Sequence, residues 1–264
     1  MSEVRLESVS VSYGDRRAVS ALTEVVAPGE WLGLVGPNGA GKSSLIRAVA
    51  ALVPSTGGIR VGGRALGEMS ERERARRIAY VPQQPIVPDD MRVRDYVLLG
   101  RWPFVGRLGA HSRSDRDAVE AILVQLRLDD LSDRPLAEVS GGERQRAVIA
   151  RALAQEPTVL LLDEPTSALD IGHQQQALEL VTELRCRRQL TVIAAMHDLT
   201  LASTYADRLL MLDGGEAVAR GAAADVLTAE RLGAVFHACV TVEVDPGDGT
   251  VIVVPRRGFP VVPT

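Results

Sequence analysis

Residues 36–44 read GPNGAGKSS, between the apolar stretch EWLGLVG and the segment SSLIRAVAAL, which has helical spacing. They fit the pattern G-x-x-x-x-G-K-[ST], with Gly36, Gly41, Lys42 and Ser43 in the required places. Glycines let successive backbone N–H groups curl around phosphate oxygens, and a helix that starts just after the loop directs its positive end at the same anion. The order strand, glycine loop and helix therefore predicts a triphosphate-binding loop on an α/β sheet.

Lys42 is the only lysine of the chain, since the other 29 of the 30 basic side chains are arginine. A compact ammonium on a flexible stem can reach between β- and γ-phosphates, whereas a planar guanidinium is larger and forked. We therefore interpret Lys42 as a phosphate ligand; the alternative is a glycine-rich turn that binds nothing. After the loop, Leu45, Val49 and Leu52 are expected on one face of the helix.

Composition restricts the class of protein. With 264 residues, 46% of them hydrophobic, the chain can bury one large core or two small ones. The net charge of −4 gives no general attraction to nucleic acid or anionic lipid. Cys186 and Cys239 form no CxxC pair, which suits a reducing compartment. MSEVRLESVS has no signal pattern and the longest apolar runs are strand-length, so no membrane span is expected.

A second motif is TVLLLDEP at 158–165, an apolar strand that ends in Asp163 and Glu164. Such a strand suits the middle of a parallel sheet, and these sheets bind ligands at the carboxyl ends of their strands. Asp163 can hold Mg²⁺ together with Ser43, and Glu164 can orient or deprotonate an attacking water. The alternative is a charged strand end that caps a turn before Pro165.

The stretch VSGGERQRAVIARALAQEP, 139–157, is helical in its spacing and opens with Ser140, Gly141 and Gly142. It offers a second anion-binding helix end. One triphosphate cannot easily use both helix ends of the same molecule, whereas a second subunit could supply one of them. The alternative is an ordinary serine N-cap beside glycines, since serine is a common N-cap residue.

Four single polar residues stand at informative places: Tyr13, Gln83, Asp170 and His197. Each has an ordinary explanation, as a half-buried strand tyrosine, a loop glutamine, a helix N-cap or a core histidine. His197 follows the buried strand TVIAAM, which predicts it at the same sheet edge as Asp163.

Together these stretches resemble the ATP-binding subunit of an ATP-binding-cassette (ABC) transporter, over about Val4 to Thr228. A phosphate loop is shared by many families, but SGGE ahead of the DE strand end is specific. The resemblance implies ATP and Mg²⁺ as ligands and Tyr13 as the aromatic that stacks on adenine. The implied nucleotide-binding loop consists of Gly36, Pro37, Asn38, Gly39, Ala40, Gly41, Lys42, Ser43 and Ser44.

The family also assigns a role to each remaining motif. Gln83 falls in the Q-loop, Asp170 in the D-loop, and His197 at the switch histidine. The implied catalytic residues are Glu164, His197, Gln83 and Lys42, and the implied Mg²⁺ ligands are Ser43, Gln83 and Asp163. Two subunits close head-to-tail around two ATPs, so the chain is expected to form a homodimer. The signature that acts in trans is Ser140, Gly141, Gly142 and Glu143.

The departures from the family pattern are small. Val139 replaces the usual leucine of the signature and Ser44 replaces the usual threonine. Glu143 replaces the commoner glutamine, and a carboxylate facing phosphate would repel it. Glu143 is therefore expected to face ribose or a neighbouring arginine.

Segment 93–116, with its GR-x-P motif, resembles importer ATPases for iron–siderophore complexes, haem and cobalamin. The resemblance implies a separate membrane permease, an extracytoplasmic binding protein reached only indirectly, and a peripheral position on the cytoplasmic face of the membrane. The rival is a soluble ABC ATPase that acts on nucleic acid or ribosomes, which the net charge disfavours.

The permease is expected to dock near Trp102 and Phe104, in RWPFVGRL at 101–108. Pro103, Gly106 and Gly109 should break any helix that would bury a stripe, and the flanks DDMRVRD and HSRSDRD look polar and exposed. The alternative is that this loop folds inward as a plug.

The expected fold is that of an ABC-type P-loop NTPase, α/β with a mostly parallel core sheet, as one ATPase domain over 1–264. Its expected parts are an antiparallel β layer over 1–30, a core over 31–82 and 158–225, a helical subdomain inserted over 84–156, and a C-terminal extension over 226–264. In that extension VTVEV and TVIVV alternate about DPGDG, which predicts a hairpin whose simplest role is added packing.

Overall fold

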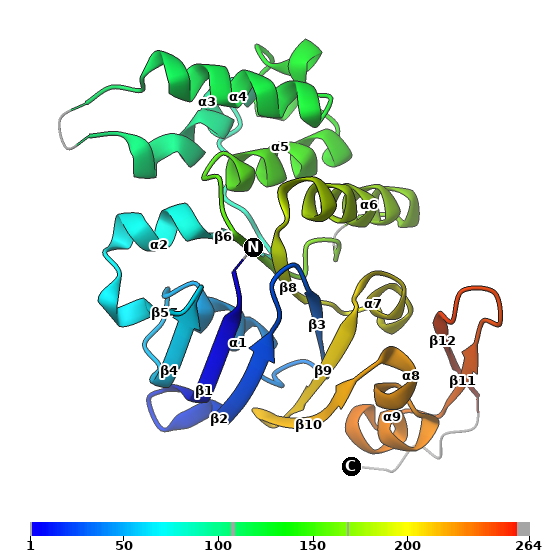
Figure 1. Cartoon of the computed structure of the whole chain (residues 1–264). Coiled ribbons are helices and arrows are strands. Elements are labelled where there is room, and N and C mark those ends of the chain that lie inside the picture. Colours follow the sequence, from blue (N-terminus) through cyan, green and yellow to red (C-terminus); the bar gives the residue numbers. More distant parts are fainter. Residues whose placement is uncertain (1, 107–108, 168, 258–264) are drawn as a thin grey trace. The chain divides into compact units, whose positions relative to one another are not determined.

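The computed structural model describes residues 2–106, 109–167 and 169–257 (Figure 1). The chain divides into two compact units. The first unit consists of the residues up to Val4, Ala27–Gly29 and Arg60–Val192. The second unit consists of Arg5–Val26, Glu30–Ile59 and the chain from Ile193 onward. Arg107 and Leu108 of the segment RWPFVGRL lie outside the described residues, as does Ala168, two residues before Asp170.

The second unit carries three successive strands of the four-stranded N-terminal sheet, in the order β2-β1-β4. These strands are β1 (Val4–Tyr13), β2 (Arg16–Val26) and β4 (Thr56–Val61), the last of which ends in the first unit. Burial alternates along the end of β2, where Leu22, Glu24 and Val26 are buried between exposed neighbours. One face therefore packs on the core, and the predicted antiparallel layer is confirmed.

The core strands of the second unit lead to the glycine loop. β3 (Trp31–Val35) is buried along its whole length and pairs in parallel with β9 (Arg208–Asp213). β9 in turn pairs antiparallel with β10 (Glu216–Gly221). Directly after the loop comes α1 (Lys42–Val49).

Helix α1 is shorter than expected. Leu45 and Val49 are buried as predicted, but Leu52 lies beyond the helix and is exposed, so the prediction for Leu52 is wrong. The helix ends because Ala51 has a left-handed backbone with φ +57°, which no helix can continue through.

The first unit also contains parallel strands, which carry the acidic motif. β6 (Ile78–Val81) pairs in parallel with β7 (Val159–Asp163), and β7 is buried throughout. β8 (Thr191–Ala195) begins in this unit and continues into the second. The other elements of this unit outside 84–156 are β5 (Arg64–Ala65), the 3₁₀ helix η1 (Leu66–Glu68), α2 (Glu71–Arg77) and α6 (Ile171–Arg188).

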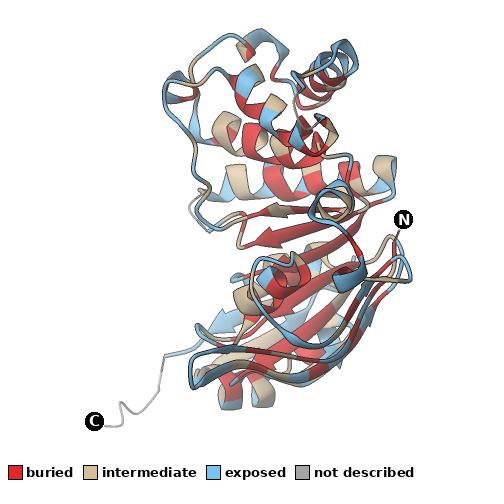
Figure 2. Cartoon of the chain, turned by 90° about the vertical axis from the view of Figure 1, so that its left-hand side faces the viewer, coloured by how far each residue is buried: buried red, intermediate tan, exposed pale blue. Residues whose placement is uncertain are grey.

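Between residues 84 and 156 the described chain is helical and contains no named strand. Its α-helices are α3 (Val93–Leu98), α4 (Arg113–Gln125) and α5 (Gly141–Leu153), with 3₁₀ helices η2 (Leu99–Phe104), η3 (Asp129–Leu131) and η4 (Leu136–Glu138). α5 buries most of its second half, from Ala147 to Leu153, whereas its first turn is only partly buried (Figure 2). The predicted helical insertion is therefore confirmed.

Arg101 connects three parts of this helical region. Its side chain is buried, and its guanidinium donates to Asp115 Oδ1 at 3.0 Å and to the Ala154 carbonyl at 2.9 Å. It also lies 2.8 Å from a Glu156 carboxylate oxygen and 3.7 Å from the centre of the Phe104 ring. Since Arg101 is 14 residues from Asp115 and 53 from Ala154, one side chain ties η2 to α4 and to the end of α5.

Asp115 corrects the expectation that the flank HSRSDRD is exposed. It is buried, and it forms a capping box with Ser112 at the start of α4. Burial alone would raise the pKa of Asp115, but hydrogen bonds from Ser112 and Arg101 and the positive charge of Arg101 outweigh it and leave this pKa below its usual value.

The C-terminal part of the second unit packs on α7 (Leu199–Tyr205). The hairpin of β11 (Val240–Val244) and β12 (Val251–Pro255) follows the short helices α8 (Ala223–Val226) and α9 (Ala229–Phe236). Val251 N–H donates to Ser203 Oγ at 2.7 Å, which ties β12 to α7. No helix in the described ranges is both long enough and apolar enough to cross a bilayer.

Asp115→Asn should lower the free energy of unfolding by about 3 kcal/mol, because it leaves the buried Arg101 with only the half-exposed Glu156 as a charged partner. The pKa of Asp115 is lower in the folded than in the unfolded chain, so this stabilisation is full above about pH 4 and is lost as the pH falls through the folded value. Urea unfolding at pH 7 and at lower pH measures both effects.

The matched control is Asp117→Asn on the same helix, where the carboxylate is exposed. It should change the free energy of unfolding by less than about 0.5 kcal/mol. Equal effects of the two substitutions would contradict the role given to the Arg101–Asp115 pair.

Candidate functional site

The loop between β3 and α1 has a backbone that requires glycine at two positions. Gly36 and Gly41 have φ values of +146° and +105°. A Cβ on Gly36 would lie 2.1 Å from the Leu212 carbonyl oxygen, and one on Gly41 would lie 2.3 Å from that of Ala18. Both contacts are with backbone, which cannot move aside, so any side chain would displace the loop.

Lys42 is the first residue of α1 and is buried. Its Nζ donates to the carbonyl oxygens of Gly36 at 2.6 Å and Pro37 at 3.1 Å, so the ammonium is held over its own loop. A guanidinium would bring two more nitrogens into the same space. This geometry gives a physical reason for the one lysine of the sequence.

Tyr13 and His197 belong to the same unit as this loop. Tyr13 ends β1 and is 46% exposed. His197 follows β8 and is exposed, which is not the environment of a core histidine. Met196 N–H donates to the Leu34 carbonyl at 2.9 Å, so His197 directly follows a residue bonded to β3, the strand that leads into the loop.

The first unit brings together two of the predicted residues, Gln83 and Glu164. Gln83 Nε2 donates to Glu164 Oε2 at 2.7 Å. Glu164 has φ +49°, a conformation that costs a residue with a side chain about 1 kcal/mol and turns the chain sharply at the end of β7. The Q-loop amide and the second acid of the DE pair are therefore in direct contact.

Asp163, the last residue of β7, is completely buried. Its Oδ2 accepts a hydrogen bond from the Tyr80 hydroxyl at 3.2 Å. Sequence reasoning missed Tyr80, although its place on β6 next to β7, three residues before Gln83, is a signal that could have found it. An oriented carboxylate with hard oxygen donors fits Mg²⁺, which proteins bind through one or two carboxylates together with substrate phosphates.

Metal ligands of other kinds do not cluster in the described ranges. These residues contain no group of three or more His, Cys, Asp or Glu side chains placed to hold a metal ion.

Ser140 and Glu143 form a capping box at the start of α5. Ser140 N–H donates to Glu143 Oε2 at 2.8 Å, and Glu143 N–H donates to Ser140 Oγ at 3.3 Å. The hydrogen bonds from Ser140, followed by the charges of Arg146 and Arg134, lower the pKa of Glu143. The partner of the Glu143 carboxylate is thus a backbone N–H that the sequence analysis did not name, with arginines nearby.

Asp170 is the N-cap of α6, which is the ordinary explanation considered for this residue in the sequence. Its Oδ1 accepts from the His173 backbone N–H at 2.9 Å, and both carboxylate oxygens lie 2.8 Å from His173 Nδ1. These hydrogen bonds lower the pKa of Asp170. The predicted D-loop residue is therefore also the residue that caps α6.

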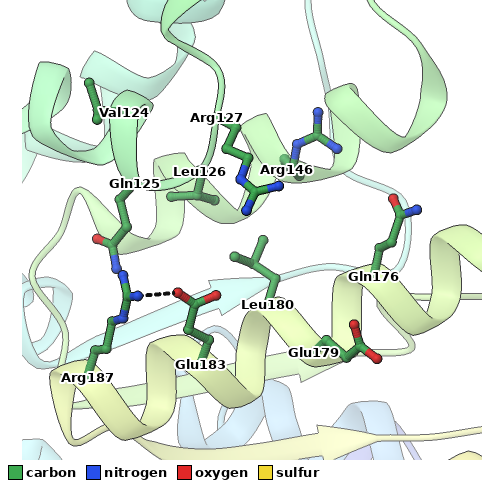
Figure 3. A pocket seen from close by; sticks show the side chains of 10 residues that line it. All are labelled: Val124, Gln125, Leu126, Arg127, Arg146, Gln176, Glu179, Leu180, Glu183 and Arg187. Carbon is green, nitrogen blue, oxygen red and sulfur yellow. Dashed lines mark ion pairs between the residues drawn. The ribbon is translucent and has the colours of Figure 1, made fainter.

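A groove of about 720 Å³ lies where α4 ends, beside α5 and α6 (Figure 3). Arg127 and Arg146 reach into it from one side, and Glu183 pairs with Arg187 at 2.8 Å on the other. None of the predicted site residues lines this groove. It is therefore distinct from the glycine loop.

The segment proposed for the permease divides into an outward and an inward part. Trp102 is 67% exposed and meets His111 edge-on, with ring centres 6.4 Å apart. Phe104 is half-buried beneath the guanidinium groups of Arg76 and Arg101, and Val105 is buried. Pro103 lies inside the 3₁₀ helix η2. A short, tightly wound helix therefore forms where Pro103 was expected to prevent one.

The chain is similar to known proteins over almost its whole length. It is 41% identical to a hemin import ATP-binding protein, HmuV, of Rhodococcus jostii, covering 96% of this chain and 86% of that one. It is 36% identical to the ferric enterobactin transport ATP-binding protein FepC of Escherichia coli, covering 97% and 94%.

The fold of the chain also matches that of a solved structure. A chain of a metal-chelate type ABC transporter, in an inward-facing conformation, superposes with a TM-score of 0.84 at 29% identity and covers 97% of both chains. The family described as ABC transporter matches residues 19–167, which include the glycine loop, the signature and the DE strand end. The chain therefore belongs to the ABC transporter family, whose ATP-binding subunits hydrolyse ATP.

Proposed function

We propose that this chain is the ATP-hydrolysing subunit of an importer that takes up a metal chelate through a separate membrane permease. The similarity to haem and ferric enterobactin import ATP-binding proteins over nearly the whole chain carries this proposal. An iron–siderophore complex is the cargo that we place first, then cobalamin or haem. The relatives give no support to an ATPase acting on nucleic acid or ribosomes, which the net charge of −4 also disfavours.

In the second unit, the loop around Lys42 would bind the phosphates of ATP and Tyr13 would stack on adenine. The glycine backbone and the buried ammonium support the first assignment, and the exposed ring of Tyr13 supports the second. His197, exposed at the end of β8, would act as the switch histidine.

In the first unit, Glu164 would orient or deprotonate the attacking water, with Gln83 holding its carboxylate. Asp163 would bind Mg²⁺, and Ser43 and Gln83 remain the other predicted ligands. When bound, Mg²⁺ supplies positive charge to the phosphate oxygens. Tyr80 would keep the Asp163 carboxylate in one orientation.

The assembly that we propose is a homodimer at the cytoplasmic face of the membrane, bound peripherally to the permease. The signature from Ser140 to Glu143 would meet the nucleotide of the other subunit. The binding protein outside the membrane would be reached only through the permease.

Lys42→Arg should lower ATP turnover about a hundredfold or more although the charge is kept, because the guanidinium cannot occupy the space between the Gly36 and Pro37 carbonyls. Arg47→Lys, the reverse change at an exposed position of α1, is the matched control and should leave turnover unchanged. Turnover of Lys42→Arg within a few-fold of the parent would refute the fit argument.

The same pair of variants tests the transport function. Cells whose only copy carries Lys42→Arg should lose uptake of the cargo, measured in parallel with a labelled iron–siderophore, haem and cobalamin. Cells with Arg47→Lys should keep it. Normal uptake of all three chelates in the Lys42→Arg strain would exclude the proposed function.

Glu164→Gln should keep ATP binding but lower hydrolysis about a hundredfold or more, because the amide is nearly isosteric and cannot accept the proton of water. ATP should then be trapped, and the closed dimer should accumulate in gel filtration with ATP and Mg²⁺. Replacing ATP by ADP is the control and should leave monomer. A variant that stays monomeric with ATP, or that turns over normally, contradicts the role of Glu164.

Trp102→Ala should weaken co-purification with the permease while leaving the free energy of unfolding of the isolated subunit nearly unchanged, since the ring is largely exposed. Phe104→Ala should instead lower the free energy of unfolding of the isolated subunit, because it removes the ring beneath Arg76 and Arg101. Parental yield of the complex with Trp102→Ala would show that the permease docks elsewhere.

A further inference from the structure

The chain between Glu164 and Asp170 is held by side chains from two helices. Gln145 of α5 donates to the Pro165 carbonyl at 2.8 Å, and Gln174 of α6 donates to the Thr166 carbonyl at 3.1 Å. These bonds hold the carbonyls of Pro165 and Thr166, the first two residues after Glu164.

Asp170 and His173 form the contact that ends this segment. An ionised carboxylate only accepts hydrogen bonds, so the proton of the imidazole must be on Nδ1, which lies 2.8 Å from both Asp170 oxygens. With the backbone N–H of His173 at 2.9 Å, one residue donates to this carboxylate twice. The ring is therefore fixed in both position and orientation.

The other edge of the same ring lies against the signature. A Cβ on Gly142 would come within 2.4 Å of His173 Cδ2 and 2.9 Å of Nε2, so the imidazole occupies the space that a side chain at residue 142 would need. The remaining cavity between α5 and α6 at this point is about 10 Å³, no more than the space that a single water molecule needs. His173 thus touches the start of α5 with one edge and the start of α6 with the other.

We propose that His173 is a positioning residue for ATP hydrolysis, which sets the signature turn at Gly142 and the D-loop carboxylate of Asp170 in one arrangement within the subunit. This rests on the proposed function, in which both of these elements act on the nucleotide of the second subunit. His173 touches neither nucleotide in this scheme and acts only through its two neighbours.

Three substitutions separate the hydrogen bond from the packing. His173→Ala removes both, His173→Asn keeps an N–H donor near the position of Nδ1, and His173→Leu keeps volume without a donor. Gln175→Ala is the matched control, because Gln175 is exposed on the same helix and its amide donates to Glu179, one turn further along that helix. The measurements are kcat and KM for ATP, MgATP binding by the subunit, and urea unfolding, all on the full chain.

We expect kcat to fall about tenfold in His173→Ala and His173→Leu, the size of effect that a lost hydrogen bond to a charged group has. His173→Asn should recover kcat to within about threefold of the parent. MgATP binding by the monomer should stay unchanged in all three, because the residues that bind a subunit's own nucleotide are untouched.

Two results would overturn the inference. One is a kcat within twofold of the parent in His173→Ala, and the other is recovery of kcat by His173→Leu but not by His173→Asn, which would leave only packing. If the parent and Gln175→Ala fail to hydrolyse ATP, the proposed function fails as well. If the parent and Gln175→Ala hydrolyse ATP normally and either overturning result is found, the role of His173 is refuted and the proposed function stands.

Discussion

The close approach of two carbonyl oxygens to the glycine loop is the constraint on which the proposed nucleotide site depends. Leu212 and Ala18 leave no room for a Cβ at Gly36 and Gly41, so the loop has one path from β3 into α1. That path places the carbonyls of Gly36 and Pro37 around the Lys42 ammonium. The positions of the lysine, the glycines and the strand are therefore coupled, so a change at any one of them displaces the others.

Capping boxes give the acidic side chains of this chain a second, structural use. Ser70 with Glu73, Ser112 with Asp115, and Ser140 with Glu143 each close a helix start with the same pair of hydrogen bonds. Hydrogen bonds from Ser70 and Arg64 lower the pKa of Glu73 to about 2. The N-cap explanation of Ser140 and its proposed signature role thus do not compete, because the cap fixes the helix start that the proposed trans contact would use.

Motifs that are continuous in sequence could be predicted, because strand, loop and helix follow one another in a fixed order. This holds for the glycine loop, for the apolar strand that ends in Asp163, and for the alternation of VTVEV and TVIVV in the hairpin strands. The predicted place of Leu52 on the helix is wrong because helical spacing does not reveal where a helix stops. The left-handed backbone of Ala51 ends this helix before Leu52.

Contacts between distant residues could not be predicted from one sequence. Tyr80 and Asp163 are 83 residues apart, and Arg101 and Ala154 are 53 apart, so their pairing exists only once the strands and helices have packed. The same holds for the burial of Asp115, whose sequence neighbours are polar.

Amide side chains give the first unit a way to sense changes at Glu164. Gln83 bonds its carboxylate, while Gln145 and Gln174 bond the carbonyls of the two residues that follow it. Each of these bonds joins a neutral donor to a different element, so none needs a change of charge to break or form. A shift of the Glu164 carboxylate therefore either carries Gln83 with it or breaks this hydrogen bond, and a shift of Pro165 does the same to the hydrogen bond from Gln145 of α5.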